Sequence, residues 1–337
     1  MFESPKKRIE AALKRFAAET REETPEFAKF ANLVMEFVRR PGGRLRPALC
    51  LVSGQAFGCG DGEALERLAV GLELLHAMAL VHDDLIDRAE IRRDGPALHR
   101  VLTSKVKNEG SGRDLALLAG DWLLLRALST IIEAGFDSET RKRIERLVLS
   151  KAEDAVRGAV REIELTGVSP ELYSRADVID MYRLKTAEYS FVCPLVAGAL
   201  AGQASSKAVS VLTRIGVKLG TAYQMRDDLD ELRSSQNEDV ALRRPTILLW
   251  HAWHSMSTEN RSCVKDYMAM PKPDPEACER VVDILSSSSA PEAVRREIKE
   301  LCVSAMELFE TTDLPENLRL AVAGIIERLT ASQNLGV

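Results

Sequence analysis

Residues 65–87 read LERLAVGLELLHAMALVHDDLID, and this stretch decides the fold class. Its apolar side chains recur at steps of three and four residues, which places them on one face of an α-helix. The members of that face are Leu65, Leu68, Ala69, Leu72, Leu75, His76 and Ala79. The segments 139–165, 176–201 and 207–232 have similar spacing and are too long for strands. No alternating apolar run bounded by Asn-Gly or Asp-Gly indicates a hairpin, so the sequence predicts an all-α protein.

The breaks between the helical segments are short. Pro41-Gly42-Gly43 is one of them, and Ser169-Pro170-Glu171 predicts a helix start with Ser169 as the N-cap. The chain has no internal repeat and no linker long enough to separate domains. We therefore expect one helical domain over residues 1–337.

Composition excludes several classes of protein. The chain has 46 Lys and Arg residues against 51 Asp and Glu residues, a net charge of −5, which argues against nucleic-acid binding. Because no uninterrupted run of about 18 apolar residues occurs, we expect no transmembrane segment. The basic N-terminus lacks an apolar core after it, and the six cysteines have no CxxC pairing. These features predict a cytoplasmic protein with reduced thiols.

Two acidic clusters stand on predicted helices. Asp83 and Asp87 lie four residues apart and therefore share a helix face, and Asp227 and Glu231 repeat this arrangement. Like charges at this spacing cost about a few tenths of a kcal/mol per pair on an exposed helix. A bound Mg²⁺ ion would reverse the sign of that energy, because it takes carboxylate oxygens as ligands and keeps other positions for water or phosphate. Both clusters therefore predict sites for divalent cations.

Arginines flank the first acidic cluster on both sides. Arg44 and Arg46 precede it, and Arg92 and Arg93 follow it. Since Mg²⁺ held by two acidic faces implies an anionic ligand, and Arg is suited to bidentate phosphate contacts, we expect a diphosphate.

The chain resembles the trans-isoprenyl diphosphate synthases, or polyprenyl synthetases, and among them those that make geranylgeranyl and farnesyl diphosphate. The resemblance extends over about residues 40–250, and seven motifs in the family's order are highly specific. The motifs are Gly42-Gly43-Arg44-Leu45-Arg46-Pro47, His76, Asp83-Asp84-x-x-Asp87, Arg92-Arg93-x-Gly95-Pro96-x-x-His99, Gly120-Asp121, Lys185-Thr186-Ala187 and Gln224-x-x-Asp227-Asp228-x-x-Glu231.

The resemblance implies a fold and a reaction. The fold is an antiparallel helix bundle around a central substrate cavity, with both acidic motifs at its mouth and the C-terminal helices completing the bundle. The reaction joins an allylic prenyl diphosphate to isopentenyl diphosphate, and the product is a longer trans-prenyl diphosphate. The family is commonly a homodimer, which we also expect here.

The resemblance assigns a role to each motif residue. Three Mg²⁺ ions would be held by Asp83, Asp87 and Asp227, with Glu231 as a further ligand. Asp84 and Asp228 complete the catalytic carboxylates, while Arg92 and Lys185 would contact the allylic diphosphate. Thr186 and Gln224 would face the allylic cation. Arg46, His76 and Arg93 would bind isopentenyl diphosphate. Met78 and Ala79, just before the first acidic motif, would set the chain length, and their size predicts a C20 or longer product.

Three departures from the family pattern leave alternatives open. Gly43 stands where the family has a lysine for isopentenyl diphosphate, and the adjacent Arg44 is a candidate to replace that cation. Glu231 ends the second motif in place of Asp, and the following loop, 234–239, is short, with Arg244 where the family has a lysine. The allylic side is thus better preserved than the isopentenyl side. The alternatives are a terpene cyclase that acts on an allylic diphosphate alone and a non-catalytic regulatory subunit of a prenyl synthase.

Overall fold

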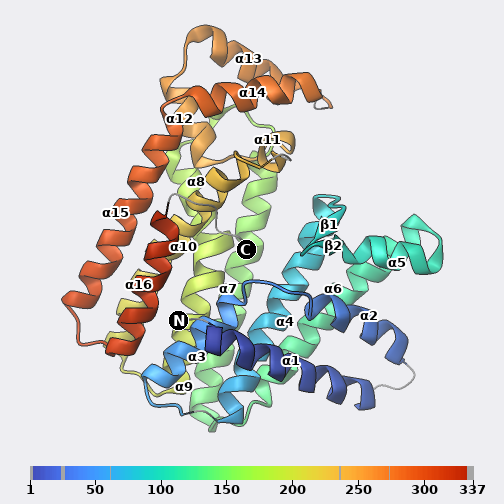
Figure 1. Ribbon diagram of the computed structural model, residues 1–337, viewed down its shortest axis with the longest axis vertical. Coiled ribbons are helices and arrows are strands. Elements are labelled where there is room, and N and C mark those ends of the chain that lie inside the picture. Colours follow the sequence, from blue (N-terminus) through green and yellow to red (C-terminus); the bar gives the residue numbers. More distant parts are fainter. Residues whose placement is uncertain (1–2, 24–26, 61, 235–236, 273, 332–337) are drawn as a thin grey trace. The chain divides into compact units, whose positions relative to one another are not determined.

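The computed structural model describes residues 3–23, 27–60, 62–234, 237–272 and 274–331 (Figure 1). Within these ranges the regular structure is helical apart from one two-stranded hairpin, which confirms the all-α prediction. The chain divides into two compact units. The first consists of Met1–Glu145 with Ala197–Ala204, and the second of Arg146–Val196 with Ser205–Gly336. The expectation of one domain stays a prediction.

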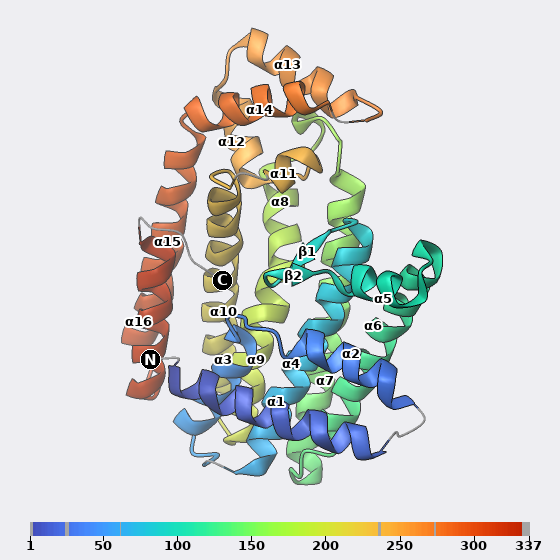
Figure 2. The ribbon, with the colours of Figure 1, turned by 45° about the vertical axis from the view of Figure 1, so that its right-hand side comes forward.

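The first unit is built around helices α4 and α6, which run side by side (Figures 1 and 2). Gly71 allows this close approach, because a Cβ atom at that position would collide with Ile131 of α6. The faces of α4 and α6 that meet are apolar and fully buried, as the spacing predicts. The elements of this unit are α1 (Glu3–Glu23), α2 (Ala28–Val38), α3 (Leu45–Ala56), α4 (Glu63–Ile86), β1 (Ile91–Arg92), β2 (Gly95–Pro96), α5 (Leu98–Val106) and α6 (Glu109–Ile132).

The hairpin β1–β2 corrects the expectation that no hairpin occurs. Its strands have two residues each, and Ile91 pairs with Pro96 and Arg92 with Gly95. The turn residues Arg93 and Asp94 both have positive φ angles, 53° and 56°, which is the geometry of a tight hairpin turn. Such short strands give no alternating pattern, so the sequence periodicity did not reveal them.

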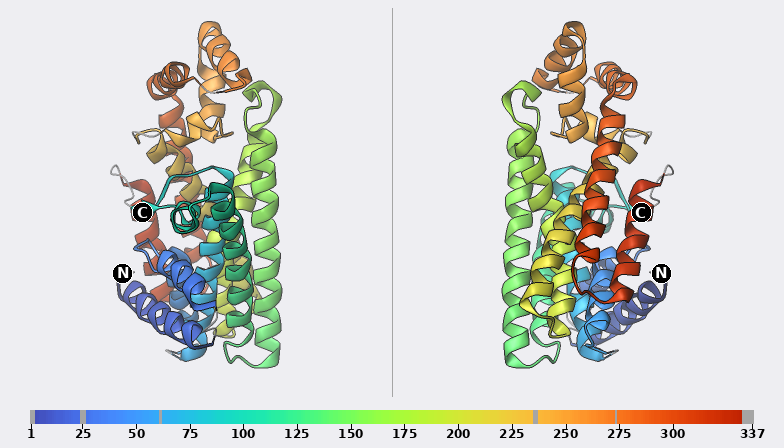
Figure 3. Two further views of the ribbon diagram at one scale, coloured as in Figure 1. Left: turned by 90° about the vertical axis from the view of Figure 1, so that its right-hand side faces the viewer. Right: turned by 90° about the vertical axis from the view of Figure 1, so that its left-hand side faces the viewer.

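The second unit packs η3 and α15 against the long helix α10. Helices α15 and α16 also lie side by side (Figure 3). The expected segment 207–232 corresponds to α10, and 139–165 corresponds to α7. The elements are η2 (Pro170–Leu172), α8 (Arg175–Tyr182), η3 (Arg183–Val192), α10 (Ser206–Glu231), α11 (Glu238–Ala241), α12 (Ile247–Ser255), α13 (Thr258–Ala269), α14 (Pro275–Ser287), α15 (Ala290–Glu310) and α16 (Glu316–Thr330), while α7 (Ser138–Leu165) and α9 (Cys193–Ala201) have residues in both units.

The expected helix 176–201 is continuous but changes its winding. It runs as α8, then as the π-helix η3, and then as α9. A separate 3₁₀ turn begins at Pro170 with Ser169 at its N-cap position, as expected, but it spans only residues 170–172 and Ser169 makes no capping hydrogen bond. The helix begins at Arg175, where Ser174 and Asp177 form a capping box. Ser174 caps this helix because its side chain and that of Asp177 together satisfy two backbone N–H groups.

Helix α6 is long and apolar enough to cross a membrane, judged by length and composition only. Its most apolar 18-residue window has a mean hydropathy of 1.7, and 39% of that window is buried within the protein. A core helix of a soluble protein has the same properties, so the expectation of no transmembrane segment stays a prediction. Four large apolar side chains of this helix remain exposed, namely Leu117, Leu118, Leu125 and Ile132.

Candidate active site

The first acidic motif lies at the C-terminal end of α4, and its three aspartates divide into two kinds. Asp84 is 1% exposed, and its Oδ1 accepts a hydrogen bond from Nε of Arg92 at 2.7 Å, with Nη2 of Arg92 at 2.6 Å. Burial raises the pKa of Asp84 to about 6, against the opposing effect of Arg92 and with a further increase from the other two aspartates. Asp83 and Asp87 stay partly exposed. The inner carboxylate is thus held by the protein, and the outer pair faces solvent.

A basic cluster on the same unit surrounds His76 of α4. Burial lowers the pKa of His76 well below its ordinary value, and the charges of Arg46 and Arg93 lower it further. The imidazole is therefore neutral at neutral pH. Its Nδ1 atom is buried without a hydrogen-bond partner in the described part of the chain. A neutral ring among guanidinium groups suits a negatively charged ligand.

Glu73 organises this basic cluster, and the sequence analysis did not identify it. Its side chain is buried, and Oε1 accepts hydrogen bonds from Nη1 of Arg44 and, at 3.1 Å, from Nη2 of Arg93. Because a buried carboxylate must be paired, the two arginines and Glu73 fix one another. The available signal was an acidic residue on the apolar side of a predicted helix, three residues before His76.

Arg44 is engaged entirely within the protein. Its guanidinium is fully buried, and Nε donates to Glu10 at 2.7 Å. Nη2 donates to the carbonyl of Arg40 at 2.7 Å. Nη1 donates both to the carbonyl of Val38, at 3.0 Å, and to Glu73. This geometry gives no support to the expectation that Arg44 replaces the missing lysine at Gly43. Its substrate-binding role stays a prediction.

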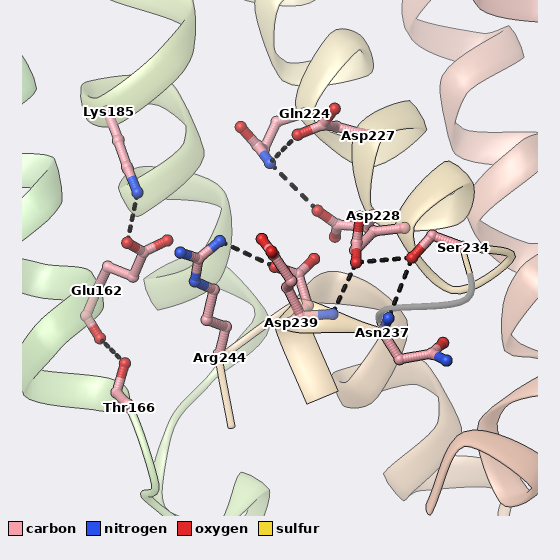
Figure 4. A network of polar contacts seen from close by, with 12 residues as sticks. Glu162, Thr166, Lys185, Gln224, Asp227, Asp228, Ser234, Asn237, Asp239 and Arg244 are labelled. Carbon is pink, nitrogen blue, oxygen red and sulfur yellow. Dashed lines mark hydrogen bonds and ion pairs between the residues drawn. The ribbon is translucent and has the colours of Figure 1, made fainter. Parts of the chain in front are cut away.

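The second acidic motif ends α10 in the second unit and repeats the same division (Figure 4). Asp228 is buried, and burial raises its pKa well above the ordinary value. Asp227 is exposed to solvent at its surface. Its pKa is nevertheless raised to about 6, first by desolvation of the carboxylate by the surrounding protein and then by the negative charges of Asp239 and Glu231. Oε1 of Glu231 accepts from the hydroxyl of Ser234 at 2.9 Å. Residues 235 and 236 of the short loop lie outside the described residues.

Two neighbouring residues of η3 make contacts with two different helices, and Figure 4 shows the contact of Lys185. Lys185 donates from Nζ to Oε2 of Glu162 on α7. The hydroxyl of Thr186 donates to Oε1 of Gln224 on α10 at 2.6 Å. The side chains of the predicted lysine, threonine and glutamine are thus oriented by direct hydrogen bonds, and Glu162 is a partner that sequence reasoning missed.

Arg244 is paired with an acid that the sequence analysis also missed. Its Nη1 atom donates to Oδ1 of Asp239 at 3.1 Å (Figure 4). Asp239 in turn raises the pKa of both Asp227 and Asp228 through its charge. The second unit thus gathers the acids Glu162, Asp227, Asp228, Glu231 and Asp239 with the cations Lys185 and Arg244. The first unit gathers the basic cluster and the first acidic motif.

The acidic motifs fit Mg²⁺ held partly by a ligand and not by the protein alone. No group of three or more His, Cys, Asp or Glu side chains in the described ranges is arranged to hold a metal ion. Burial is the main cause of the raised pKa values of Asp84 and Asp227, and nearby carboxylates raise both pKa values further. Mg²⁺ is commonly bound by one or two carboxylates together with substrate phosphates and water, and each motif supplies such a pair.

Known proteins are similar to this chain in sequence. A family model described as Polyprenyl synthetase matches residues 28–285. The chain is 36% identical over 258 residues to a geranylgeranyl diphosphate synthase of Rhodobacter capsulatus, which covers 72% of this chain and 80% of that protein. It is 27% identical over 300 residues to a short chain isoprenyl diphosphate synthase of Methanothermobacter thermautotrophicus, covering 85% of this chain and 86% of that protein.

The fold also has solved counterparts. The crystal structure of a geranylgeranyl pyrophosphate synthase from Corynebacterium glutamicum, complexed with isoprenyl diphosphate and magnesium, aligns with a TM-score of 0.87. The two chains are 23% identical, and the alignment covers 96% of this chain and 98% of the other. This likeness supports the predicted fold class.

We expect Mg²⁺ and inorganic pyrophosphate to stabilise the protein together far more than either alone, and more at pH 8 than at pH 5.5. The carboxyl group of Asp227, with a pKa of about 6, must lose its proton before it binds Mg²⁺, so affinity falls below pH 6. Because the pKa values of Asp84 and Asp227 are raised above those of the unfolded chain, the metal-free protein itself loses stability as the pH rises through 6. Thermal melts at both pH values measure the effect.

Asp227→Asn should abolish most of the joint stabilisation by Mg²⁺ and pyrophosphate. Asp266→Asn, which changes an exposed acid of α13, is the matched control and should behave like the unmodified protein. An equal response of the two variants would contradict a cation site at the second motif.

Proposed function

Because the chain belongs to the polyprenyl synthetase family, we propose that it is a Mg²⁺-dependent trans-prenyltransferase that condenses an allylic diphosphate with isopentenyl diphosphate. The observation that carries this proposal is the paired design of the acidic motifs, each with one buried carboxylate held by the protein and outer carboxylates toward solvent. We place the enzyme in the cytoplasm, with no nucleic acid among its partners.

The residues of the second unit support ionisation of the allylic substrate. Lys185 and Arg244 would bind the allylic diphosphate, together with Arg92 of the first unit. When bound, three Mg²⁺ ions, held by Asp83, Asp87, Asp227 and Glu231, would neutralise that diphosphate and stabilise it as a leaving group. The C–O bond breaks with its electron pair on the diphosphate. The oxygen atoms of Thr186 and Gln224 would then stabilise the allylic cation electrostatically.

The residues of the first unit support binding of the second substrate. Arg46, His76 and Arg93 would hold the diphosphate of isopentenyl diphosphate, and Glu73 fixes the Arg93 guanidinium for that contact. The double bond of isopentenyl diphosphate attacks the cation, a C–C bond forms, and one proton is lost to restore a double bond. The product is one C5 unit longer and keeps a diphosphate.

One observation favours a second candidate. Arg44, the candidate to replace the cation missing at Gly43, has a buried guanidinium that is engaged by Glu10, Glu73 and backbone carbonyls. A weakened isopentenyl site is what a terpene cyclase would tolerate. The retained cluster of Arg46, His76 and Arg93, and the synthases that are its relatives, favour elongation over a cyclase or a regulatory subunit.

Product analysis tests the proposal directly. Purified protein with Mg²⁺ and C5, C10, C15 or C20 allylic diphosphates should form longer prenyl diphosphates only when isopentenyl diphosphate is present. Asp83→Ala should lower the rate at least about a hundredfold, because a ligand that stabilises the leaving diphosphate is lost. Hydrocarbons or alcohols made from the allylic substrate alone would identify a cyclase, and inactivity in every mixture would favour the regulatory subunit.

We propose a product of C20 or longer, set by Met78 and Ala79. Both side chains are partly exposed and lie on α4 just before the first acidic motif. Met78→Phe should shorten the main product by one or more C5 units, because a larger, stiffer ring closes space that the flexible thioether leaves open. Chromatography of the dephosphorylated products measures this. Met256→Phe, after α12, is the control, and an unchanged length in Met78→Phe would place the limit elsewhere.

We also propose that the protein is a homodimer. Leu118, Leu125 and Ile132 repeat every seven residues on α6 and stay exposed, and Leu149, Val156 and Ile163 do the same on α7. Exposed apolar stripes at this spacing are typical of helices that pair with another chain. Burial in a dimer also accounts for the apolar character of α6 without a membrane.

Leu125→Lys should convert the dimer to monomers, because it places a charge at a position that is 66% exposed in the single chain. Light scattering after size-exclusion chromatography without detergent measures the mass. Leu172→Lys, at a 74% exposed position of η2, is the control and should leave the mass unchanged. A monomeric unmodified protein, or one that needs detergent to stay soluble, would contradict the proposal.

A further inference from the structure

Tyr182 is a buried residue that neither the motifs nor the proposed mechanism uses. It is the last residue of α8 and is 2% exposed. Its hydroxyl oxygen accepts a hydrogen bond from the backbone N–H of Ile247 at 2.8 Å. The same hydroxyl donates to Oδ2 of Asp228. Both hydrogen-bonding capacities of this tyrosine are therefore committed, and its orientation is fixed from two sides.

The hydrogen bonds continue from Asp228 to the residues proposed to face the cation. Oδ1 of Asp228 accepts from Nε2 of Gln224 at 3.3 Å, and Oε1 of Gln224 accepts from the hydroxyl of Thr186 at 2.6 Å. Figure 4 shows the amide of Gln224 directed at Asp228 and Asp227. A continuous chain thus leads from the backbone of Ile247 through Tyr182 and Asp228 to Gln224 and Thr186.

The orientation of the Gln224 amide matters for the proposed reaction. An amide can turn by 180°, which exchanges its oxygen, an acceptor, for an NH₂ group that carries positive charge at its hydrogens. Oδ1 of Asp228 accepts from the NH₂ group of Gln224, and the turned amide would instead place its oxygen against that carboxyl oxygen, so Asp228 selects the observed orientation. The amide oxygen is then left on the side of Thr186, where it can stabilise a developing cation.

We propose that Tyr182 is a positioning residue for the allylic-cation step, which it controls by fixing Asp228 and, through Asp228, the orientation of Gln224. The inference rests on the proposed prenyltransferase function. Tyr182 touches neither substrate nor cation in this assignment, and it acts only through the two residues that follow it in the chain of hydrogen bonds.

Tyr182→Phe tests the assignment, with Tyr267→Phe as a matched control. Tyr267 is also buried in the second unit, but its hydroxyl donates to the carbonyl of Val240 at 2.8 Å and not to Asp228. We expect Tyr182→Phe to lower kcat about tenfold while both KM values change less than about twofold, because ground-state binding is retained. The fraction of allylic substrate released as prenyl alcohol should rise, since water captures a cation that is held less well.

The control should lose a similar amount of thermal stability, because it too removes a buried hydroxyl, but should keep kcat and the alcohol fraction. A double-mutant cycle with Gln224→Leu separates positioning from general destabilisation. With the amide absent, adding Tyr182→Phe should cause no further loss of kcat. Independent, multiplicative losses would overturn the inference.

Three further outcomes are distinguishable. If Tyr182→Phe does not fold, Asp228→Asn tests the same series of hydrogen bonds, because an amide at position 228 no longer selects one orientation of Gln224. An unchanged alcohol fraction in Asp228→Asn would overturn the inference. If the unmodified protein elongates no substrate, the proposed function fails and this inference falls with it. If the unmodified protein is active and Tyr182→Phe equals Tyr267→Phe, only the role of Tyr182 is overturned.

Discussion

Carboxylates placed side by side on one helix repel each other, and the structure meets this constraint in the same way in both acidic motifs. The middle aspartate of each motif turns inward and receives a donor from outside its own helix, Arg92 for Asp84 and Tyr182 for Asp228. The outer residues stay toward solvent. One buried, fixed carboxylate thus orients a helix end whose outer carboxylates can meet a cation.

Pairing of cations with acids also distinguishes the residues proposed for isopentenyl diphosphate from those proposed for the allylic diphosphate. In the first unit, Glu73 holds Arg93 in place but also engages Arg44, the neighbour of Gly43, within the protein. In the second unit, Arg244 stands in for a lysine and is oriented by Asp239. An arginine keeps its charge and offers a planar set of donors, so Arg244 retains the groups needed for the phosphate contact proposed for it.

The sequence predicted those features that depend on neighbours along the chain. The long helices α7 and α10 begin and end within one residue of the expected segments, because amphipathic periodicity is a local signal. The start expected at Pro170 holds only for a short 3₁₀ turn, and the long helix starts at Arg175 because Ser174, and not Ser169, finds a capping partner. Glu73, Asp239, Glu162 and Tyr182 were missed because their partners are set by folding; Tyr182 and Asp228, for example, are 46 residues apart. The catalytic assignments themselves came from the resemblance, and the structure supplies their orientation.

The winding of η3 shows why orientation could not be read from the motif alone. A π-helix of ten residues is rare, and it includes both Lys185 and Thr186. Glycines face it from both neighbouring helices, since a Cβ atom at Gly158 of α7 would collide with the backbone of Lys185 and one at Gly220 of α10 with that of Ala187. The segment is therefore confined between two helices at backbone contact, and consecutive side chains reach opposite neighbours, Glu162 and Gln224. The chemistry assigned to the lysine and the threonine thus depends on glycines that carry no chemistry of their own.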